Sequence, residues 1–335
     1  MSLKDFSETV RPPIEQELKR VIGLVDDRHS QELRKMLAYH LGWEGEGAGE
    51  QARGKRIRPQ IVLLGTSAAG KDWRDALQAA AAVELIHNFS LIHDDIEDQS
   101  DFRHGRKTVW ALWGEAQAIN AGDCMYSLAY RAILQSNNRP EYITRAVDML
   151  SETCIALTEG QHLDMAYEKR DDLSLEAYWT MIGGKTASLL SCSAAIGATI
   201  TGADEKIVAT LKEFAWNLGL AFQVQDDWLG IWGDSALTGK SADSDLQSGK
   251  KSLPVLLGLQ SSPEFRKKWI KRPFTNTEIA DMAGLLKTAG IQIQLETETT
   301  RLTEKAKAAL DRLDPENGAV SDLRVLADTL LKRKK

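Results

Sequence analysis

The spacing of apolar residues constrains the fold of this chain more than any other feature. Apolar side chains recur every third or fourth position through most of the 335 residues, and runs that alternate Val, Ile and Thr are absent. Because this spacing lines apolar side chains along one face of an α-helix, it predicts an all-α protein. We predict helices over residues 12–41, 57–69, 73–99, 108–136, 140–168, 174–200, 204–232, 252–262, 276–289, 291–313 and 316–333.

Local signals mark where some of these helices begin. Pro12-Pro13 and Pro59 suit the first turn of a helix, where a missing N–H costs nothing. Thr275 followed by Glu278 is a capping-box pattern. These signals support starts near residues 12, 57 and 276.

Two polar segments, 45–50 and 233–249, are predicted to be loops. We find no linker and no repeat of fixed period along the chain. Many long helices with short connections predict one large helical bundle around a central cavity, with residues 1–335 as a single domain.

Composition excludes several classes of protein. Apolar residues make up 43% of the chain, too many for a disordered protein, and a net charge of −6 disfavours nucleic-acid binding. The most apolar stretch, 188–200, is too short to span a bilayer, and residues 1–10 lack the apolar core of a signal peptide. Three widely spaced cysteines are typical of buried thiols in a reducing compartment. We expect a soluble, cytoplasmic protein with no membrane span.

Two predicted helices carry clustered aspartates near their ends. Asp94, Asp95 and Asp98 form D-D-x-x-D after an apolar run, with Asp94 and Asp98 on one helix face. Asp226 and Asp227 follow a second apolar run. Clustered carboxylates repel one another unless a hard cation such as Mg²⁺ binds them, often together with substrate phosphates. The alternative is a pair of acidic, solvated helix ends.

Basic residues occur near several predicted helix ends. Arginine binds phosphate as a fork and lysine as a point charge, although each of these residues alone is typical of a solvated surface. Together with the carboxylates they favour a metal-bridged diphosphate site. The residues concerned are Lys55, Arg56, Arg58, Arg103, His104, Arg106, Lys185, Lys240, Lys250 and Lys251.

At this point the chain resembles the trans-isoprenyl diphosphate synthases (polyprenyl synthetases) of the short-chain type. The resemblance runs from residue 54 to about residue 254, and the order and spacing of its motifs fit throughout. The motifs are GKRIRP, HNFSLIHDDIED, RHG, GGKTA, FQVQDD, TGK and GKKSLP.

The resemblance implies a Mg²⁺-dependent prenyltransferase that condenses isopentenyl diphosphate with an allylic diphosphate, usually as a homodimer. It implies three Mg²⁺ ions, with Asp94, Asp95, Asp98, Asp226 and Asp227 as ligands. It assigns the allylic diphosphate to Arg103, Lys185, Gln223 and Lys240, and the isopentenyl diphosphate to Lys55, Arg58 and His87, with Lys250 as a further phosphate-facing lysine. Thr186 and His104 are also expected to bind substrate.

Two positions depart from the family pattern. The second aspartate motif has Gly230 where most relatives have an aspartate, and Asp234 reaches the site only if the helix continues. The basic motif reads Arg103-His104-Gly105, where an arginine is usual at the second position. A histidine gives a weaker, pH-dependent contact, and Arg106 is the candidate that compensates.

Product length is expected to depend on the depth of the cavity. Phe89 lies five residues before Asp94, about 7.5 Å along a helix. In the family an aromatic residue here accompanies short products, and small Ser90 leaves more room than a second aromatic would. We therefore expect a C20 product, geranylgeranyl diphosphate, ahead of C15, farnesyl diphosphate; the alternative is an ordinary core phenylalanine.

Two other functions remain open. A terpene cyclase or head-to-head condensing enzyme has the same scaffold, but the N-D-x-x-S-x-x-x-E motif of cyclases is absent. A low-activity binding subunit of a heteromeric synthase is suggested by Gly230 and His104. The retention of all five aspartates argues against such a subunit.

Overall fold

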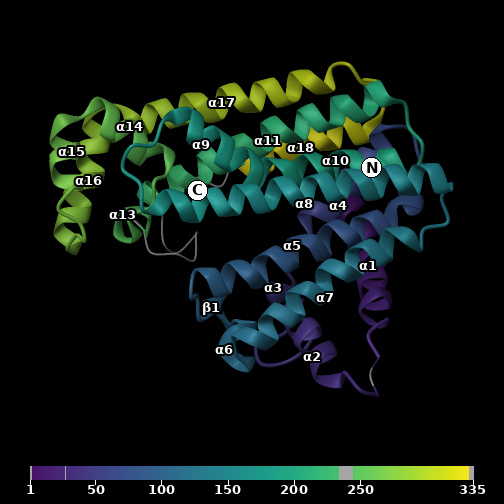
Figure 1. Cartoon of the computed structure of the whole chain (residues 1–335). Helices are drawn as coiled ribbons and strands as arrows, with labels where there is room; N and C mark the ends of the chain where they lie inside the picture. Colours follow the sequence, from purple (N-terminus) through teal and green to yellow (C-terminus); the bar gives the residue numbers. More distant parts are fainter. Residues whose placement is uncertain (1, 27, 234–243, 332–335) are drawn as a thin grey trace. The chain divides into compact units, whose positions relative to one another are not determined.

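The computed structural model describes residues 2–26, 28–233 and 244–331, and the described residues confirm the all-α prediction (Figure 1). Their only sheet is a hairpin of two short antiparallel strands. The elements are α1 (Leu3–Ile22), α2 (Gln31–His40), α3 (Glu50–Arg53), α4 (Ile57–Ala68), α5 (Leu77–Glu97), β1 (Phe102–Arg103), β2 (Arg106–Lys107), α6 (Val109–Trp113), α7 (Glu115–Leu134), α8 (Pro140–Glu168), α9 (Leu175–Ile182), α10 (Ser188–Ile200), α11 (Glu205–Trp232), α13 (Ser244–Ser248), α14 (Leu253–Ser261), α15 (Pro263–Trp269), α16 (Asn276–Thr288), α17 (Ile291–Leu310) and α18 (Gly318–Leu331).

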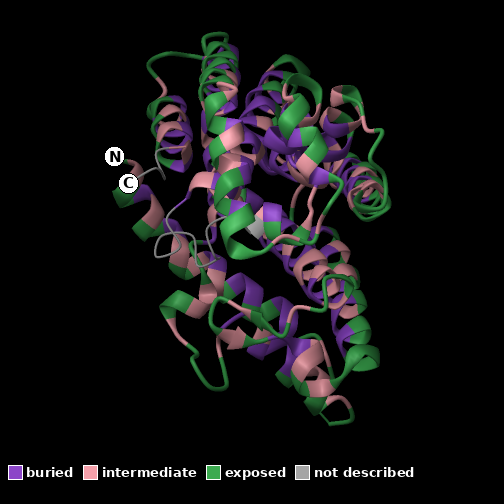
Figure 2. Ribbon diagram, turned by 90° about the vertical axis from the view of Figure 1, so that its left-hand side faces the viewer, coloured by how far each residue is buried: buried purple, intermediate pink, exposed green. Residues whose placement is uncertain are grey.

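The chain forms two compact units. Unit 1 comprises residues 1–152, 192–211 and 313–323, and unit 2 comprises residues 153–191, 212–312 and 324–335. The single domain over residues 1–335 stays a prediction. In both units the helices carry buried residues along one face and exposed residues along another (Figure 2).

Unit 1 is built around α5, which packs against α7, α4 and α1. Figure 1 shows α5 and α7 side by side in this unit. The alanine-rich start of α5, residues 79–83, is buried. Small residues also let α4 approach α10 closely, because a Cβ atom added at Gly65 would lie 2.0 Å from the carbonyl oxygen of Ala194.

Unit 2 has a large apolar core. Helix α14 packs against α9, α15, α16 and α17, and α16 also packs against α15 and α17. Phe265 and Trp269 of α15 stack with ring centroids 5.7 Å apart, and both are fully buried. They join Tyr178, Met282 and Leu286 in the same core. Tyr178 thereby brings a polar hydroxyl into an otherwise apolar region.

The capping box predicted at Thr275 and Glu278 is confirmed, since each side chain binds the other residue's backbone N–H. The start predicted at Pro12-Pro13 is wrong. A capping box of Ser2 and Asp5 begins α1 at Leu3, and both prolines lie inside the helix. Proline is expensive there because it removes an intrahelical hydrogen bond.

Other boundaries also differ from the prediction. The helix expected over 12–41 is two helices, α1 and α2, and the one expected over 108–136 is divided at Gly114, whose φ of 84° breaks the helix. Helix α15 was not predicted, although Ser262 caps it and Pro263 occupies its first turn. Part of the segment 233–249 is helical in α13, and its residues 234–243 lie outside the described part.

None of the described helices is both long enough and apolar enough to traverse a lipid bilayer. The three cysteines, all of them described, form no disulfide. Cys154 and Cys192 are buried as expected, whereas Cys124 is only partly buried.

The contact between α4 and α10 predicts that Gly65→Ala destabilises the fold. The added methyl group would collide with the Ala194 backbone, and such overpacking costs about 1–3 kcal/mol. Gly284→Ala in α16 is the matched control, because a Cβ atom there meets open space. We expect the control to be neutral or up to about 1 kcal/mol more stable in urea unfolding. Equal stability of the two variants would contradict the close packing.

Candidate active site

The first aspartate motif lies at the C-terminal end of α5 in unit 1. Asp94 and Asp95 belong to the last turn of the helix, and Asp98 is its C-cap. Asp95 is buried, Asp94 is half-buried and Asp98 is exposed. The C-terminal end of a helix carries partial negative charge, so it adds to the repulsion among these carboxylates. The end of α5 therefore favours a bound cation.

The hairpin of β1 and β2 places Arg103 against these carboxylates. His104 and Gly105 form its turn with φ values of 52° and 75°. The Nε of Arg103 donates to Asp95 Oδ1 at 2.8 Å, and Nη2 donates to Asp94 Oδ2 at 3.4 Å. Burial raises the pKa of Asp95 to about 6, against the opposing charge of Arg103. Arg103, predicted to contact phosphate, here partly neutralises the aspartates.

A second polar group of unit 1 joins α4 to α5. The Nη1 of Arg58 lies 3.0 Å from Nε2 of His87. Since a guanidinium can only donate, this nitrogen of His87 accepts and the ring is neutral. Burial, followed by the charge of Arg58, holds the pKa of His87 well below its usual value. The structure thus brings together two of the residues predicted to bind isopentenyl diphosphate, whereas Lys55 is exposed.

Arg58 is available to an anion. Its Nε is buried and has no hydrogen-bond partner within the described part of the chain. The neighbouring Arg56 differs, since its Nε donates to Glu15 at 2.8 Å and its Nη1 to Glu84 at 2.9 Å. Arg56 therefore holds the fold of unit 1 together and is not a candidate ligand.

Arg106 does not compensate for the histidine at position 104. Its guanidinium donates to the carbonyl oxygens of Tyr39, Glu44 and Glu46 at 2.8–2.9 Å and lies over the Tyr39 ring. All three of its nitrogen atoms are therefore engaged by the backbone. His104 itself is exposed.

Aromatic side chains of α5 and α7 meet in unit 1. The ring of Phe89 contacts His93 and Tyr126 edge to face, with centroids 4.8 and 5.3 Å apart. Tyr126 in turn contacts Tyr130 one turn further along α7. Ser90 donates to a carbonyl oxygen of its own helix. Sequence reasoning found Phe89 and Ser90 but missed Tyr126, because nothing local pairs α5 with α7.

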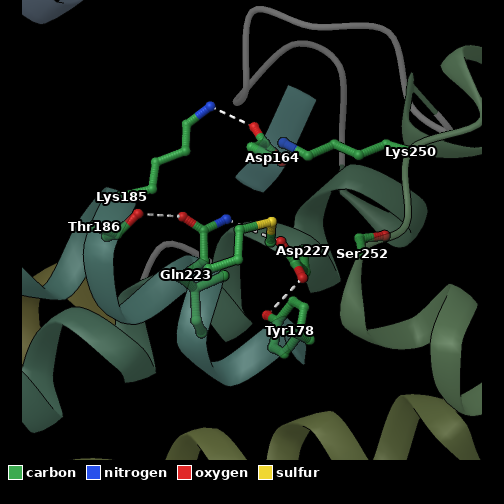
Figure 3. A pocket seen from close by; sticks show the side chains of 10 residues that line it. Asp164, Tyr178, Lys185, Thr186, Gln223, Asp227, Lys250 and Ser252 are labelled. Carbon is green, nitrogen blue, oxygen red and sulfur yellow. Dashed lines mark hydrogen bonds and ion pairs between the residues drawn. The ribbon is translucent and has the colours of Figure 1, made fainter. Parts of the chain in front are cut away.

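The second aspartate motif lies on α11 in unit 2 (Figure 3). Asp226 is exposed, whereas Asp227 is buried and accepts three hydrogen bonds. These come from the Tyr178 hydroxyl at 2.8 Å, the Leu253 N–H at 2.8 Å and Gln223 Nε2 at 2.9 Å. Burial raises the pKa of Asp227 to about 7. Asp226 is the more accessible of the two carboxylates, and the metal-ligand roles of both stay predictions.

A pocket of unit 2 gathers the predicted phosphate-binding residues of this unit. Lys185 donates to Asp164 at 2.5 Å, and Thr186 donates to Gln223 Oε1 at 2.8 Å (Figure 3). Burial alone would lower the pKa of Lys250. The charges of nearby carboxylates, first of all that of Asp164, outweigh this effect and hold the pKa above its ordinary value. Both lysines of the pocket therefore lie close to carboxylates.

Close backbone packing explains this arrangement. The segment Gly183–Ala187 forms a π-helical turn between α9 and α10. A Cβ atom at Gly160 of α8 would lie 2.1 Å from the backbone nitrogen of Lys185, so the turn packs directly against α8. Asp164, one helical turn after Gly160, then faces Lys185. Sequence reasoning missed Asp164, although its spacing from Gly160 was a usable signal.

The departure at Gly230 has a structural consequence. A Cβ atom there would lie 2.7 Å from Oδ2 of Asp245, so the carboxylate of α13 packs directly against the glycine. Asp234 and Lys240 lie outside the described residues.

No three His, Cys, Asp or Glu side chains in the described ranges are already gathered as a metal cage. The carboxylates nevertheless fit magnesium, which prefers oxygen ligands and is often held by one or two carboxylates plus phosphate oxygens. Asp94, Asp98 and Asp226 have the donor atoms and the exposure for this coordination.

Comparison with known proteins gives a consistent result. Residues 49–285 match the family model described as polyprenyl synthetase. The chain is 44% identical over 231 residues to a (2E,6E)-farnesyl diphosphate synthase of Mycobacterium tuberculosis, covering 68% of this chain. It is 41% identical over 234 residues to a geranylgeranyl diphosphate synthase of the same species, covering 69% of this chain and 67% of the relative. The match spans 64% of the farnesyl enzyme's length.

Solved structures agree in fold along nearly the whole chain. The polyprenyl synthetase of Streptomyces coelicolor superposes with a TM-score of 0.88 at 35% identity, covering 98% of this chain and 100% of that one. A geranylgeranyl pyrophosphate synthase of Corynebacterium glutamicum, complexed with isoprenyl diphosphate and magnesium, gives a TM-score of 0.86 at 29% identity, with 99% and 100% covered. The predicted isoprenoid synthase fold is therefore confirmed.

The burial of Asp227 predicts a specific pH dependence of stability. The pKa of Asp227 is about 7 in the folded chain against an ordinary value of 3.8. Its carboxyl group therefore contributes fully to the free energy of unfolding below about pH 4, and this contribution is lost as the pH rises through 7. Without divalent metal, we expect the free energy of unfolding of Asp227→Asn relative to wild type to rise over this window by up to about 4 kcal/mol.

Urea unfolding at several pH values measures this effect. Asp226→Asn changes the exposed neighbour and is the control, which should keep the wild-type pH dependence. An Asp227→Asn profile parallel to that of the wild type would show that the buried carboxyl does not titrate in this range.

Proposed function

The chain belongs to the polyprenyl synthetase family, and we propose that it is a trans-prenyltransferase that condenses isopentenyl diphosphate with an allylic diphosphate. The observation that carries this proposal is that each unit combines carboxylates, which can bind metal ions, with cationic side chains, which can bind a diphosphate. Unit 1 combines a carboxylate cluster with the unsatisfied Arg58 and the neutral His87. Unit 2 combines Asp226 with the half-buried Lys185 and Lys250 of its pocket.

The metal requirement is proposed as three Mg²⁺ ions. Asp94 and Asp98 would hold two of them with Asp95, and Asp226 would hold the third with Asp227. When bound, the ions neutralise the diphosphate and stabilise the negative charge that develops on it as it leaves. Relatives of known structure support this role, since one contains magnesium and another, from Caulobacter crescentus, contains calcium, each with isoprenyl diphosphate.

The chain's own cations bind and orient the allylic diphosphate. We assign this role to Lys185, Thr186, Gln223 and Lys250, together with Arg103 and with Lys240, which lies outside the described residues. Lys185 now binds Asp164, so a diphosphate would compete with this carboxylate for the ammonium group. Cations that are already in position stabilise a departing anion without reorganising at the moment of reaction.

Isopentenyl diphosphate is assigned to the polar residues that join α4 to α5 in unit 1. Arg58 and His87 would bind its diphosphate, with Lys55 and His104 at more exposed positions. The double bond of this substrate attacks the allylic cation, and a proton then leaves the adduct. We infer that the departing diphosphate accepts this proton, while apolar walls exclude water from the cation.

Product length is proposed to be C20 in preference to C15. Relatives of similar identity bear both names, so names alone do not decide between them. Phe89 lies five residues before Asp94, the first aspartate of the motif, and its ring forms an aromatic pair with Tyr126 of α7. This pair would limit elongation of the chain, and the small Ser90 beside it would permit C20.

The assembly and location of the protein are also proposals. A homodimer and a cytoplasmic location are expected for this family. The low-activity subunit of a heteromeric synthase is the second candidate, because Gly230 and His104 both depart from the usual charge pattern.

A single assay tests the function. Purified protein is incubated with Mg²⁺, radiolabelled isopentenyl diphosphate and each allylic primer in turn, and the products are sized. We expect linear prenyl diphosphates and, for Asp94→Ala, a loss of at least about 100-fold in kcat with the fold intact by circular dichroism. A released hydrocarbon would indicate a cyclase, absence of turnover without a partner would indicate the subunit, and an active Asp94→Ala would refute the metal assignment.

Phe89→Ala should lengthen the products. Removing the ring eliminates its contact with Tyr126 and opens space for further five-carbon units. Chromatography of the products is the measurement, with Leu134→Ala on the exposed side of α7 as the control. An unchanged product distribution would exclude Phe89 as the length-limiting residue.

A further inference from the structure

The segment that joins α3 to α4 in unit 1 has an unusual backbone at Arg56. This residue is the N-cap of α4, and its φ of 48° and ψ of 44° lie in the left-handed region. A residue with a Cβ atom is disfavoured in this region unless other contacts hold it there. The contacts of Arg56 and of the neighbouring Lys55 are therefore part of what determines the shape of this segment.

The guanidinium of Arg56 is held from three directions within unit 1. Its Nε donates to Glu15 of α1 at 2.8 Å, and its Nη1 donates to Glu84 of α5 at 2.9 Å. Its Nη2 donates to the carbonyl oxygen of Leu41 at 2.9 Å. Arg56 and Glu84 are both buried. Breaking a buried pair of this kind leaves one charge without compensation, so the side chain of Arg56 is strongly held in place.

A second contact holds the backbone on the other side of Arg56. Gln60 of α4 donates a side-chain N–H to the carbonyl oxygen of Lys55 at 2.6 Å. The amide oxygen of Gln60 accepts from the Ser7 hydroxyl at 2.7 Å, which fixes its orientation. The backbone at residue 55 and the side chain at residue 56 are thus both anchored, while the side chain of Lys55 stays exposed.

One face of α5 contacts both arginines of this segment. Glu84 and His87 are three residues apart on α5 and therefore share a face of the helix. Glu84 binds Arg56, and Nε2 of His87 lies 3.0 Å from Nη1 of Arg58. Asn88 donates to Oε1 of Glu84 at 3.2 Å and so helps to orient this carboxylate. The contact of Arg56 with Glu84 therefore fixes where Arg58 meets His87.

The two arginines differ in the groups that surround them. Arg56 is paired with two carboxylates, whereas Arg58 forms no ion pair within the described ranges of the chain and keeps an Nε without a partner there. A guanidinium whose nitrogen atoms already bind carboxylates and a carbonyl group has no donor left for a substrate. Arg56 is consequently suited to hold the segment, and Arg58 to bind an anion.

From this geometry we propose that Arg56, bound to Glu84, is the positioning residue of the isopentenyl diphosphate site, because it sets the register of residues 55–58 against α5 and so places Arg58 beside His87. The proposal rests on the proposed function and adds a residue that does not itself touch the substrate. An ion pair with a structural role alone would change the stability of the protein. A positioning pair also changes the affinity of the folded protein for this one substrate.

Arg56→Lys tests the proposal, because lysine keeps the positive charge but lacks the planar fork that binds three acceptors at once. Calorimetric titration with isopentenyl diphosphate, without any allylic primer, gives the affinity directly. We expect Arg56→Lys to weaken binding roughly 10- to 100-fold, as for the misplacement of a binding group by about 1 Å.

Arg20→Lys is the matched control for this titration. Arg20 of α1 also binds a glutamate, Glu17, through two nitrogen atoms at 2.7 and 2.9 Å, and it belongs to the same unit. The control should bind isopentenyl diphosphate like the wild type. Weakening of the same size in Arg20→Lys would overturn the proposal, because loss of any such ion pair would then have this effect.

Steady-state kinetics separates positioning from a general structural effect. Arg56→Lys should raise the KM for isopentenyl diphosphate by the same factor as the Kd, while the KM for the allylic primer stays within about twofold of the wild-type value. Wild-type affinity in Arg56→Lys together with reduced stability in urea would show that the ion pair is only structural and would overturn the proposal. An equal rise in both KM values would also overturn it.

Glu84→Gln covers the case in which Arg56→Lys does not fold. Glutamine keeps the shape of the side chain and an oxygen acceptor but removes the charge, so we expect binding to weaken by about 3- to 10-fold. The ring nitrogen resonances of His87, measured by NMR without substrate, should also differ from those of the wild type, because the contact with Arg58 shifts. Wild-type affinity and unchanged His87 resonances in Glu84→Gln would overturn the positioning role.

Failure of the proposed function would give a different result. In that case the wild-type protein would neither bind nor consume isopentenyl diphosphate. The His87 resonances of Glu84→Gln need no substrate, so they decide separately whether Glu84 and Arg56 position Arg58.

Discussion

Carboxylates in poorly solvated positions near helix ends are the constraint on which the rest of the site depends. Asp95 and Asp227 bear this cost, because burial raises the pKa of Asp95 to about 6 and that of Asp227 to about 7. The protein reduces the cost in part, through Arg103 in unit 1 and through Tyr178 and Gln223 in unit 2. A metal-bound diphosphate would remove the remainder, because it adds positive charge to the aspartates and negative charge to the arginines and lysines.

Close packing of small residues makes these polar positions possible. In unit 2 the backbone around Gly184 rests on α8 at Gly160, and this contact places Lys185 against Asp164. In unit 1 a Cβ atom at Gly122 of α7 would lie 2.3 Å from the ring of His93, so the end of α5 lies directly against α7. In both units the polar residues are thus held by packing that leaves no room for a larger side chain.

The sequence predicted the helical class and indicated most residues of the candidate site, because both depend on local patterns, and the roles of those residues stay predictions. Apolar spacing locates α5 and α11, and the aspartates follow directly from the residues that end these apolar runs. The predicted helix boundaries are wrong where two start signals competed, since the first helix begins at the capping box of Ser2 and not at Pro12. They are also wrong where a start signal was overlooked, as at Ser262 and Pro263. Tyr126 could not be found in this way, because its partner Phe89 lies on a helix far away in the sequence, whereas the spacing of Asp164 from Gly160 was a signal that went unused.

The central claim is that the aspartates of each unit bind divalent metal ions together with a diphosphate. A crystal structure of the protein with Mg²⁺ and inorganic diphosphate tests it most directly. The account predicts metal ions that bind diphosphate together with Asp94 and Asp98, and metal bound with diphosphate at Asp226. Diphosphate bound without metal, or metal bound to carboxylates other than these, would contradict it.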